Sequence, residues 1–180
     1  MDNQTILACD DNGKFLEYIP RMEGHLGHGK RHIGITIVLL NKKGQMLLQR
    51  RKHLVFDNIW CFTADTHPLH LGERDETNEE ACVRCLDREY AIKKKINFNN
   101  YGKFNYFGIY KQYCENENCF LMVGEYNGKF ILNPEAGYEY KWVSKEDFLK
   151  DFEENPKKYA PWVPEGVELL KKFDFFCDCC

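Results

Sequence analysis

Three histidines and two glutamates are the residues whose types and spacing could bind a metal ion. They are His25, His32, His67, Glu115 and Glu117. Imidazole nitrogens combined with carboxylate oxygens suit a divalent transition metal. The two glutamates are two residues apart in an extended segment, which places both carboxylates on one face. From spacing alone, the alternative is that the histidines are surface residues in polar loops and that residues 115–118 form a solvated turn.

The stretch from Trp60 to Ile92 is predicted to position His67 where a strand ends and a loop begins. Up to Thr66, apolar or aromatic residues alternate with small polar ones, and from Asn78 the apolar residues recur at about helical spacing. Asp65 and His67 therefore lie at the end of a strand that leads through a loop to a helix. Functional groups are often placed there, because a rigid scaffold holds a polar loop open to solvent.

The elements before this stretch are predicted to be two hairpins separated by a loop. Residues 6–20 contain an apolar run, a turn at 10–13 and a second extended run. Residues 21–32 are rich in glycine, histidine and basic residues without periodicity, which predicts a loop. Residues 33–40 are continuously apolar and β-branched, as in a strand covered on both faces, and a tight turn leads to the partner strand at 45–51.

The elements after the central helix are predicted to be mostly strands. Residues 115–118 are interpreted as a turn or an irregular edge before another strand, and a short strand and a helix capped by Ser144 follow. A last helix is predicted from Glu165 to Lys172, just after Pro164. Strands outnumber helices and no linker divides the chain, so we expect one domain over residues 1–180. The fold class is α+β, with a mixed-sheet α/β/α sandwich as the specific form.

Composition indicates an ordinary globular protein. The 180 residues are 43% apolar and 29% charged, with a net charge of −3. A negative chain lacks the basic surface of a general binder of nucleic acid or of anionic membranes. No apolar run approaches the roughly 20 residues of a membrane span, and the start lacks the apolar core of a signal peptide. We therefore expect a cytoplasmic protein without membrane insertion.

Nine cysteines are interpreted as thiols in a reducing compartment. Cys82 and Cys85 form a CxxC pattern, but the pair would lie inside the predicted helix, which favours structural thiols over a zinc site. Cys61 is at even spacing from Asp65, and the interpretation favoured for it is a buried core residue. Residues 176–180 carry three of the nine cysteines, Cys177, Cys179 and Cys180, and are expected to form a flexible tail.

Several short motifs occur in a fixed order along nearly the whole chain. They are His25-x6-His32, NKKGQMLLQRR, a tryptophan, THP-x2-LGE, NEEAxxR and ENE. This order and spacing resemble type I isopentenyl diphosphate isomerase, a member of the Nudix superfamily. The resemblance implies a Nudix fold, in which a mixed β-sheet is sandwiched between α-helices and the stretch from Trp60 to Ile92 is the Nudix segment.

The resemblance also implies the roles of single residues. Three histidines and two glutamates of the family hold one divalent metal, here Mn²⁺ or Zn²⁺, and they match the five residues named first. Glu89 matches a glutamate that holds Mg²⁺ against the substrate diphosphate, and Arg51 matches an arginine that contacts this diphosphate. Tyr106 and Trp162 fall near an active-site tyrosine and near a tryptophan that stabilises a carbocation. The implied partner is a small-molecule diphosphate of isoprenoid biosynthesis.

Asp65 is the main departure from the isomerase pattern. Moving a double bond requires one group to protonate the alkene and another to remove a proton across the molecule. Glu117 matches one of these groups, whereas the other is a cysteine in the family and is Asp65 here. A carboxyl group normally titrates near pH 4, so Asp65 could serve as an acid only if burial raised its pKa.

The Nudix helix departs from the hydrolase form of the family signature. Cys85 and Arg88 replace two acidic residues, Ala91 replaces a glycine, and Glu89 is the acidic residue that remains of the cluster. This loss weakens pyrophosphate hydrolysis more than isomerisation, since the isomerases also lack most of that cluster. A lysine expected after Arg51 is missing because the segment is about two residues short, which leaves the diphosphate affinity open.

Three functions are therefore compatible with the sequence. The first is a metal-dependent enzyme like isopentenyl diphosphate isomerase, which would migrate a double bond by protonation and deprotonation with Asp65 in place of cysteine. The second is a Nudix hydrolase of a nucleoside or other diphosphate, with Glu117 or Asp65 as general base. The third is a catalytically silent domain that binds a phosphorylated ligand or a protein, against which the complete set of metal ligands argues.

Overall fold

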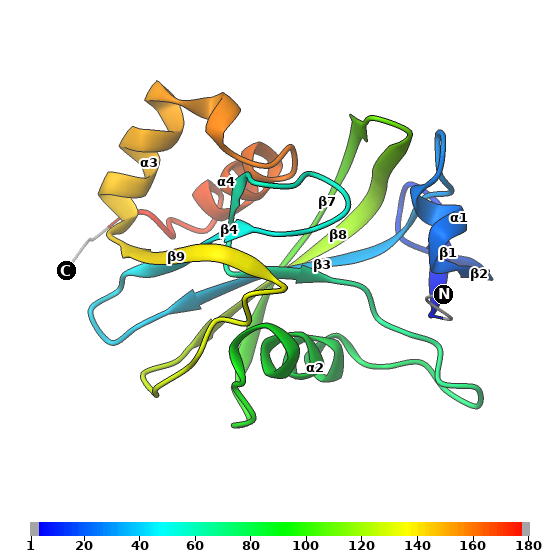
Figure 1. Cartoon of the computed structure of the whole chain (residues 1–180), viewed down its shortest axis with the longest axis horizontal. Coiled ribbons are helices and arrows are strands. Elements are labelled where there is room, and N and C mark those ends of the chain that lie inside the picture. The colour runs from blue at the N-terminus through cyan, green and yellow to red at the C-terminus, as the bar shows by residue number, and fades with distance from the viewer. Residues whose placement is uncertain (1–3, 178–180) are drawn as a thin grey trace.

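The protein folds around one mixed β-sheet with helices on both of its faces (Figure 1). The structure is a computed structural model and describes residues 4–177. Within this range the elements are, in order, β1 (Thr5–Cys9), β2 (Phe15–Pro20), α1 (Arg21–His25), β3 (His32–Leu40), β4 (Met46–Arg51), β5 (Trp60–Cys61), β6 (Ala64–Thr66), α2 (Asn78–Tyr90), β7 (Phe98–Tyr110), β8 (Tyr113–Glu125), β9 (Gly137–Val143), α3 (Lys145–Glu154), the 3-10 turn η1 (Pro156–Lys158) and α4 (Val163–Lys171). The α+β class with a mixed sheet between helices is confirmed.

Strand β3 is the centre of the sheet. It runs parallel to β8 over nine residue pairs, from His32 opposite Glu117 to Leu40 opposite Glu125. On its other side it pairs antiparallel with β6, and at its amino end with β1. Eight of its nine residues are buried, which confirms the predicted strand with two covered faces.

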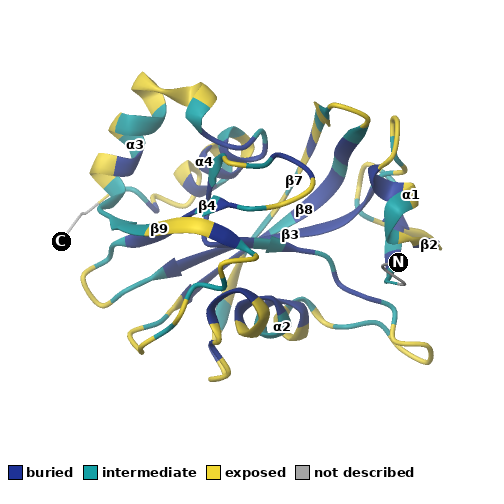
Figure 2. Ribbon diagram, in the orientation of Figure 1, coloured by how far each residue is buried: buried dark blue, intermediate teal, exposed yellow. Residues whose placement is uncertain are grey.

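Two apolar clusters cover the two faces of the sheet (Figures 1 and 2). Helix α2 packs below the sheet in this view, where Ala81, Leu86 and Tyr90 meet Ile35 and Ile37 of β3. Helices α3 and α4 cover the opposite face in a cluster that contains Phe62, Phe148, Trp162, Val163, Val167 and Leu170. Because successive side chains of a strand point to opposite faces, β3 contributes to both clusters.

Helix α2 begins and ends at residues that the sequence marks. The Thr77 side chain accepts a hydrogen bond from the Glu80 backbone N–H, and the Glu80 side chain accepts one from the Thr77 backbone N–H, which makes a capping box. The helix ends at Tyr90, and Ala91 adopts the left-handed conformation with φ 53°. Glycine is the usual residue at such a position, so Ala91 carries a backbone strain of roughly 1 kcal/mol.

The predicted strand over residues 60–66 is two short strands, β5 and β6, because it changes partner. β5 pairs with β4, whereas β6 pairs with β3. Strands β3 and β4 are paired at Leu40 and Met46, next to their connecting turn. Farther along, the Thr63 hydroxyl bridges them: it donates to the Leu47 carbonyl and accepts from the Leu39 N–H, both at 2.8 Å. The chain must therefore turn between Cys61 and Ala64.

Three further expectations differ from the structure. Residues 21–32 include the short helix α1, so His25 is held by a helix end and lies 4% exposed. Residues 115–118 are not a turn or an irregular edge: they lie inside β8, where all four pair with β7 and residues 117–118 also pair with β3, and the turn is formed by residues 111–112. Helix α4 begins at Val163, two residues before the predicted start, with Pro164 in its first turn, where a missing N–H costs nothing.

The end of the described chain still packs on the domain. The Phe176 ring stacks on Phe148 at a centroid distance of 6.1 Å. Cys177 is exposed. The rest of the expected tail, residues 178–180, lies outside the described residues.

Candidate active site

Four of the five predicted metal ligands converge at one end of the sheet. His25 comes from the end of α1, His32 from the start of β3, His67 from the loop after β6 and Glu115 from β8. One ligand atom of each lies within 4.8 Å of the others. The three imidazole centroids are 4.7 to 5.0 Å apart. Glu117, the fifth predicted ligand, contacts two members of this group, His32 and His67.

Hydrogen bonds and ion pairs orient the side chains of this cluster. Glu117 Oε1 accepts a hydrogen bond from His67 Nε2 at 2.9 Å and lies 3.5 Å from His32 Nε2. His25 Nδ1 lies 3.1 Å from Glu115 Oε2, and His32 Nδ1 faces the Lys30 carbonyl at 2.8 Å. All five side chains are buried except that of His67, which is 15% exposed.

The protonation states of the cluster suit a divalent cation. Desolvation lowers the pKa of His67 to about 3, so its imidazole is neutral at pH 7. Burial alone would raise the pKa of Glu117, but the nearby imidazoles of His32 and His67 hold it well below its usual range. Neutral imidazole and ionised carboxylate are the forms that bind metal.

Two imidazole nitrogens without a hydrogen-bond partner among the described residues test whether the cluster is suited to bind a metal. His25 Nε2 and His32 Nε2 are buried and make no hydrogen bond to any residue in the range 4–177. A buried polar atom without a partner costs free energy, which a bound cation would recover. Two unbonded nitrogens among ionised carboxylates fit a divalent metal better than a purely structural cluster.

Two glycines make room for this cluster. A Cβ atom on Gly34 of β3 would lie 1.9 Å from Glu117 Oε2, and one on Gly24 of α1 would lie 2.7 Å from His32 Nδ1. Neither glycine has a positive φ, so the requirement is for space. The sequence pattern did not single out either residue, because the clash involves side chains that are distant in the chain.

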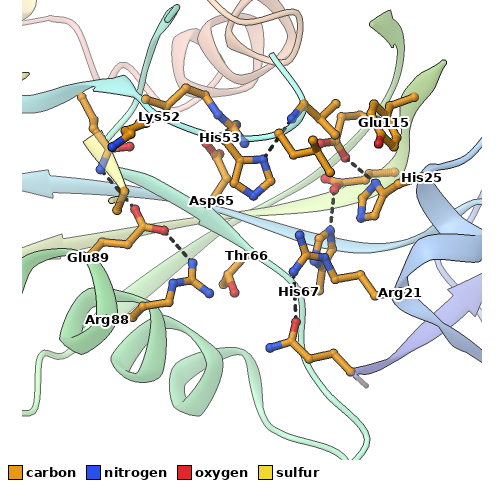
Figure 3. A pocket seen from close by; sticks show the side chains of 18 of the residues that line it. Arg21, His25, Lys52, His53, Asp65, Thr66, His67, Arg88, Glu89 and Glu115 are labelled. Atoms are coloured by element: carbon orange, nitrogen blue, oxygen red, sulfur yellow. Dashed lines mark hydrogen bonds and ion pairs between the residues drawn. The ribbon is translucent and has the colours of Figure 1, made fainter. Parts of the chain in front are cut away.

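The cluster forms one wall of a cavity of about 310 Å³ (Figure 3). This volume is at the lower end of the range for small-molecule sites. All the candidate site residues except His32 line the cavity. They are His25, Arg51, Asp65, His67, Glu89, Tyr106, Glu115, Glu117 and Trp162. The candidate residues thus share one site.

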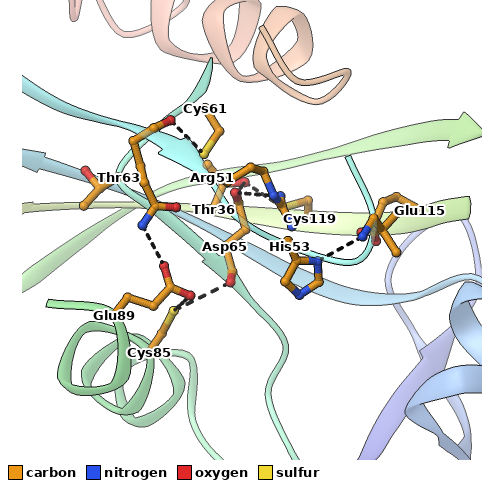
Figure 4. A network of polar contacts seen from close by, with 12 residues as sticks. Thr36, Arg51, His53, Cys61, Thr63, Asp65, Cys85, Glu89, Glu115 and Cys119 are labelled. Atoms are coloured by element: carbon orange, nitrogen blue, oxygen red, sulfur yellow. Dashed lines mark hydrogen bonds and ion pairs between the residues drawn. The ribbon is translucent and has the colours of Figure 1, made fainter. Parts of the chain in front are cut away.

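Asp65 lies in this cavity with its carboxylate held on two sides (Figure 4). Thr36 Oγ1 donates a hydrogen bond to Asp65 Oδ1 at 2.8 Å, and Arg51 Nη1 lies 3.4 Å from Asp65 Oδ2. Burial raises the pKa of Asp65 to about 7 against the opposing effects of Arg51 and Thr36. The carboxyl group can therefore hold a proton near neutral pH, as the sequence required of an acid here.

Asp65→Asn is expected to flatten the pH dependence of stability. Between about pH 4 and 7 the folded state holds a proton on Asp65 that the unfolded state has released, so stability falls with rising pH through this window. The raised pKa corresponds to a loss of about 2–4 kcal/mol over this range. Thermal or denaturant unfolding of metal-free protein from pH 4 to 8 measures it. If the stability of Asp65→Asn changed with pH as steeply as that of the wild type, a protonated Asp65 would be contradicted. Asp87→Asn, on the exposed face of α2, serves as the control.

An aromatic wall faces Arg51. The Trp162 ring lies 4.8 Å from the Arg51 guanidinium carbon and 5.6 Å from the Tyr106 ring centroid. Trp162 is 1% exposed, and its indole N–H makes no hydrogen bond within residues 4–177. Stacking of a guanidinium on an indole fixes both groups.

Glu89 projects into the cavity from α2, where its carboxylate is engaged on both oxygens. Gln49 Nε2 donates to Oε2 at 3.1 Å, and Arg88 Nη2 contacts Oε1 at 2.5 Å. The Cys85 thiol donates to Oε1 at 3.6 Å. Burial raises the pKa of Cys85 well above its usual value, so it stays a neutral thiol.

The other cysteines confirm the structural interpretation. Cys61 and Cys82 are buried, free and part of the apolar clusters, and burial raises their pKa values. Cys82 and Cys85 both lie in α2, and neither belongs to the potential metal-binding cluster found within residues 4–177.

Several cavity residues escaped the sequence analysis. They are the basic residues Arg21, Lys52, Arg84 and Arg88 and the polar residue Gln49. Thr36 also escaped it: this residue does not line the cavity but donates a hydrogen bond to Asp65. Lys52 follows Arg51 directly, but it was passed over because the segment was judged about two residues too short to supply the expected lysine. Thr36 had no visible signal, because a threonine inside a buried strand is also an ordinary core residue.

The family of the chain follows from comparison with known proteins. The model of the NUDIX domain matches residues 30–163. The chain belongs to the Nudix family. The predicted Nudix fold is thereby confirmed, and the matched range includes α2, β3, β8 and the turn that precedes α4.

Curated relatives of this Nudix chain include isopentenyl-diphosphate Delta-isomerases. One from Enterobacter sp. (strain 638) is 25% identical over 179 residues, covering 97% of this chain and 96% of the relative. Another, from Aromatoleum aromaticum, is 25% identical and covers 94% of this chain and 87% of the relative. The predicted resemblance to this isomerase is therefore confirmed.

Solved structures share the fold with this Nudix chain. A protein of Deinococcus radiodurans superposes with a TM-score of 0.68 at 17% identity and covers 92% of this chain and 97% of its own. The Ap4A hydrolase of C. elegans, as a binary complex, gives 0.54 at 20% identity with 80% and 96% covered. The NUDIX domain of Shewanella oneidensis NrtR, complexed with ADP ribose, gives 0.52 at 15% identity with 78% and 86% covered.

These matches indicate that the Nudix chain is an enzyme, of the isomerase or the hydrolase kind. Both kinds use divalent metals, in agreement with the His/Glu cluster. No helix within residues 4–177 is both long and apolar enough to cross a membrane.

Proposed function

We propose that this Nudix enzyme migrates a double bond in a small isoprenoid-type diphosphate, as isopentenyl diphosphate isomerases do. The observation that carries the proposal is that Asp65 and Glu117 reach the same cavity from the two strands that flank β3. Asp65 is opposite Thr36, and Glu117 is opposite His32. His32 and Thr36 are four residues apart in a strand, so both pairs lie on one face of the sheet.

The reaction needs two proton-transfer groups and no other covalent chemistry. One carboxyl group adds a proton to the terminal carbon of the double bond, and the other removes a proton from the carbon across the resulting cation. The double bond moves, and no atom is gained or lost. The two groups exchange their protonation states during turnover, and exchange with solvent restores them.

His25, His32, His67, Glu115 and Glu117 are the residues that would hold the divalent metal. When bound there, the cation supplies a positive charge that fixes the Glu117 carboxylate and polarises groups of the substrate. The carboxylate of Glu117 then keeps a fixed direction toward the cavity, because His67 and His32 contact one of its oxygens.

Basic side chains of the cavity give it the charge that a diphosphate requires. Arg51 and Lys52 come from β4 and the segment after it, and Arg88 comes from the end of α2. Arg21, Arg51 and Arg88 all line this cavity, and desolvation together with their charges lowers the pKa of His53 to about 2. A cationic space beside carboxylates suits a ligand with an anionic group and a reacting hydrocarbon part.

The aromatic wall is suited to the cation that forms during the reaction. Trp162 and Tyr106 are buried and line the cavity, and an aromatic face attracts a cation by about 0.5–2 kcal/mol. Burial raises the pKa of the Tyr106 hydroxyl well above its usual value, so this group remains neutral beside the substrate.

The direct test follows label in the organic part of the substrate. Purified protein with Mn²⁺ or Mg²⁺ is given isopentenyl diphosphate in deuterated water, and, in parallel, a panel of nucleoside diphosphate derivatives. Deuterium in a dimethylallyl product is the expected result. Release of phosphate or nucleotide without double-bond migration would replace the proposal by a hydrolase, and binding without turnover would replace it by a silent domain.

Asp65→Cys is expected to create or raise isomerase activity. A thiol is cheaper to desolvate than an ionised carboxylate and occupies the position of the cysteine in the resembled family. Asp65→Ser is the matched control, because serine has nearly the size of cysteine but cannot exchange a proton near neutral pH. The rate of label incorporation is measured for both. Equal rates for the two variants would overturn the claim that residue 65 occupies the position of a proton-transfer group in an isomerase site.

A further inference from the structure

The carboxylate of Glu89 is surrounded by groups that a second metal would have to displace. Arg88 Nη2 lies 2.5 Å from Oε1, and Gln49 Nε2 lies 3.1 Å from Oε2. The Glu89 side chain is 10% exposed, whereas that of Arg88 is 45% exposed. The more exposed guanidinium thus contacts a largely buried carboxylate (Figure 3).

The neighbours of Glu89 do not form a Mg²⁺ site. Magnesium is usually held by one or two carboxylates together with substrate phosphates and waters, so a site here would need the Glu89 carboxylate free to coordinate. The nearest side chains here are an amide nitrogen donor, a neutral thiol and a guanidinium, from Gln49, Cys85 and Arg88. Asp65 is held by Thr36 and Arg51, and the described range contains no second group of three potential metal ligands besides the His/Glu cluster. Mg²⁺ on Glu89, which the family resemblance implies, does not fit these residues.

We propose that Arg88 takes the place of the second metal ion: its guanidinium neutralises Glu89, and the substrate diphosphate is bound directly by Arg88, Lys52 and Arg51. The enzyme then holds one divalent cation per chain, at the His/Glu cluster. This inference rests on the proposed function for the identity of the substrate, and on the contacts of Glu89 for the missing metal.

The chemistry of a guanidinium allows it this double role. It is planar, always charged and carries five N–H donors, so it can contact a carboxylate on one side and a phosphate on another. The contacts of Arg88 with Glu89 and with the Cys85 sulfur, at 2.5 and 3.4 Å, both use Nη2. A metal replaced by arginine keeps the positive charge at the phosphate without needing further carboxylates.

Hydrogen bonds from the loop over residues 133–136 hold Arg88 and Lys52 in place. The Asn133 side chain donates to the Arg88 carbonyl at 3.0 Å, and the Asn133 N–H donates to the Glu89 carbonyl at 2.7 Å. Lys52 Nζ donates to the Pro134 carbonyl at 3.0 Å and pairs with Glu135 at 3.2 Å. The loop over residues 133–136 therefore ties the end of α2 to Lys52, so the two cations line the same side of the cavity.

The number of Mn²⁺ ions bound per chain tests the replacement. Titration followed by the electron paramagnetic resonance of free Mn²⁺ is expected to give one ion per chain in the wild type, at the His/Glu cluster, and no additional ion in Arg88→Ala, because the described range offers Glu89 no group of further ligands. Arg74→Ala is the matched control: Arg74 pairs with Glu80 outside the cavity, and its removal is expected to leave the count unchanged. Two bound ions per chain in the wild type would overturn the proposal.

Glu89→Gln in the wild-type background gives a second test, which does not depend on the stability of the Arg88 variant. Its Mn²⁺ count is expected to equal that of the wild type, because no metal is bound by Glu89. Loss of one ion in Glu89→Gln would show a metal on Glu89 and overturn the proposal. Failure of the His/Glu cluster to bind metal would lower all counts equally and leave these differences unchanged.

Inorganic pyrophosphate probes the anion site itself. Calorimetric titration of the wild type, loaded with one Mn²⁺ equivalent, is expected to give an affinity that changes less than threefold when millimolar Mg²⁺ is added. In Arg88→Ala the affinity without Mg²⁺ is expected to fall at least tenfold. Pyrophosphate binding that requires Mg²⁺ in the wild type would contradict the inference. These readouts involve no turnover, so an enzyme that fails to isomerise the proposed substrate leaves the test of Arg88 intact.

Discussion

Glu117→Gln is expected to lower the rate of double-bond migration by about 10³-fold, within the 10²–10⁴-fold range of a positioned acid or base. The amide keeps the size of the side chain but cannot take up a proton. It also replaces the oxygen that accepts from His67 at 2.9 Å by a group that can be a donor. The measurement is the initial rate of deuterium incorporation at saturating substrate, over a series of metal concentrations.

Glu115→Gln is the control that separates proton transfer from metal binding. Glu115 pairs with His25 at 3.1 Å and belongs to the same cluster, but it has no assigned part in moving protons. Its loss of activity is expected to be recovered substantially at high metal concentration, whereas that of Glu117→Gln is not. Full recovery of Glu117→Gln at high metal concentration would exclude Glu117 as a proton-transfer group.

His67→Ala is expected to remove one bound metal ion per chain. His67 contributes a neutral imidazole to a cluster in which ligand atoms lie within 4.8 Å of one another. Loss of partners that only orient metal ligands costs about 10–100-fold in affinity, so removal of a ligand should lower the affinity by more than about 100-fold. Elemental analysis of purified protein and titration with Mn²⁺ or Zn²⁺ measure the change.

His70→Ala controls for the loss of a histidine from the same loop. His70 pairs with Asp75 at 2.8 Å and does not line the cavity. Its metal content is expected to equal that of the wild type. Metal retained in His67→Ala at the wild-type level would remove the proposed site, and activity would then have to come from a different arrangement of the cavity.

The elements of the fold were largely predictable because their signals are local. The uninterrupted apolar run of β3, the capping box at Thr77 and the Ser144 cap each depend on residues a few positions apart, and each is present in the structure. The failures share one cause. Residues 60–66 and residues 115–118 owe their conformation to partner strands that are distant in the sequence, which no local pattern reveals.

The site was predictable in its members but not in its electrostatics. The types and order of the histidines and glutamates predicted which residues form the cluster. The structure brings them together through the register that sets His32 opposite Glu117. The raised pKa of Asp65 could not be read from its neighbours in the chain. It depends on the desolvation of the carboxylate among strands β3, β4 and β6, against the opposing charge of Arg51.

The sequence by itself thus determined the family, the pattern of strands and helices, and the residues that could carry metal and proton transfer. Tertiary structure decided which of these residues meet and in what state. His25 and Glu115 are 90 positions apart and become neighbours only when α1 packs on β8. Arg88 and Glu89 are adjacent in the sequence, yet only the fold shows that the guanidinium lies on the carboxylate. The physical reason is that propensity and capping act over a few residues, whereas desolvation and charge pairing depend on whatever the folded chain places within a few ångströms.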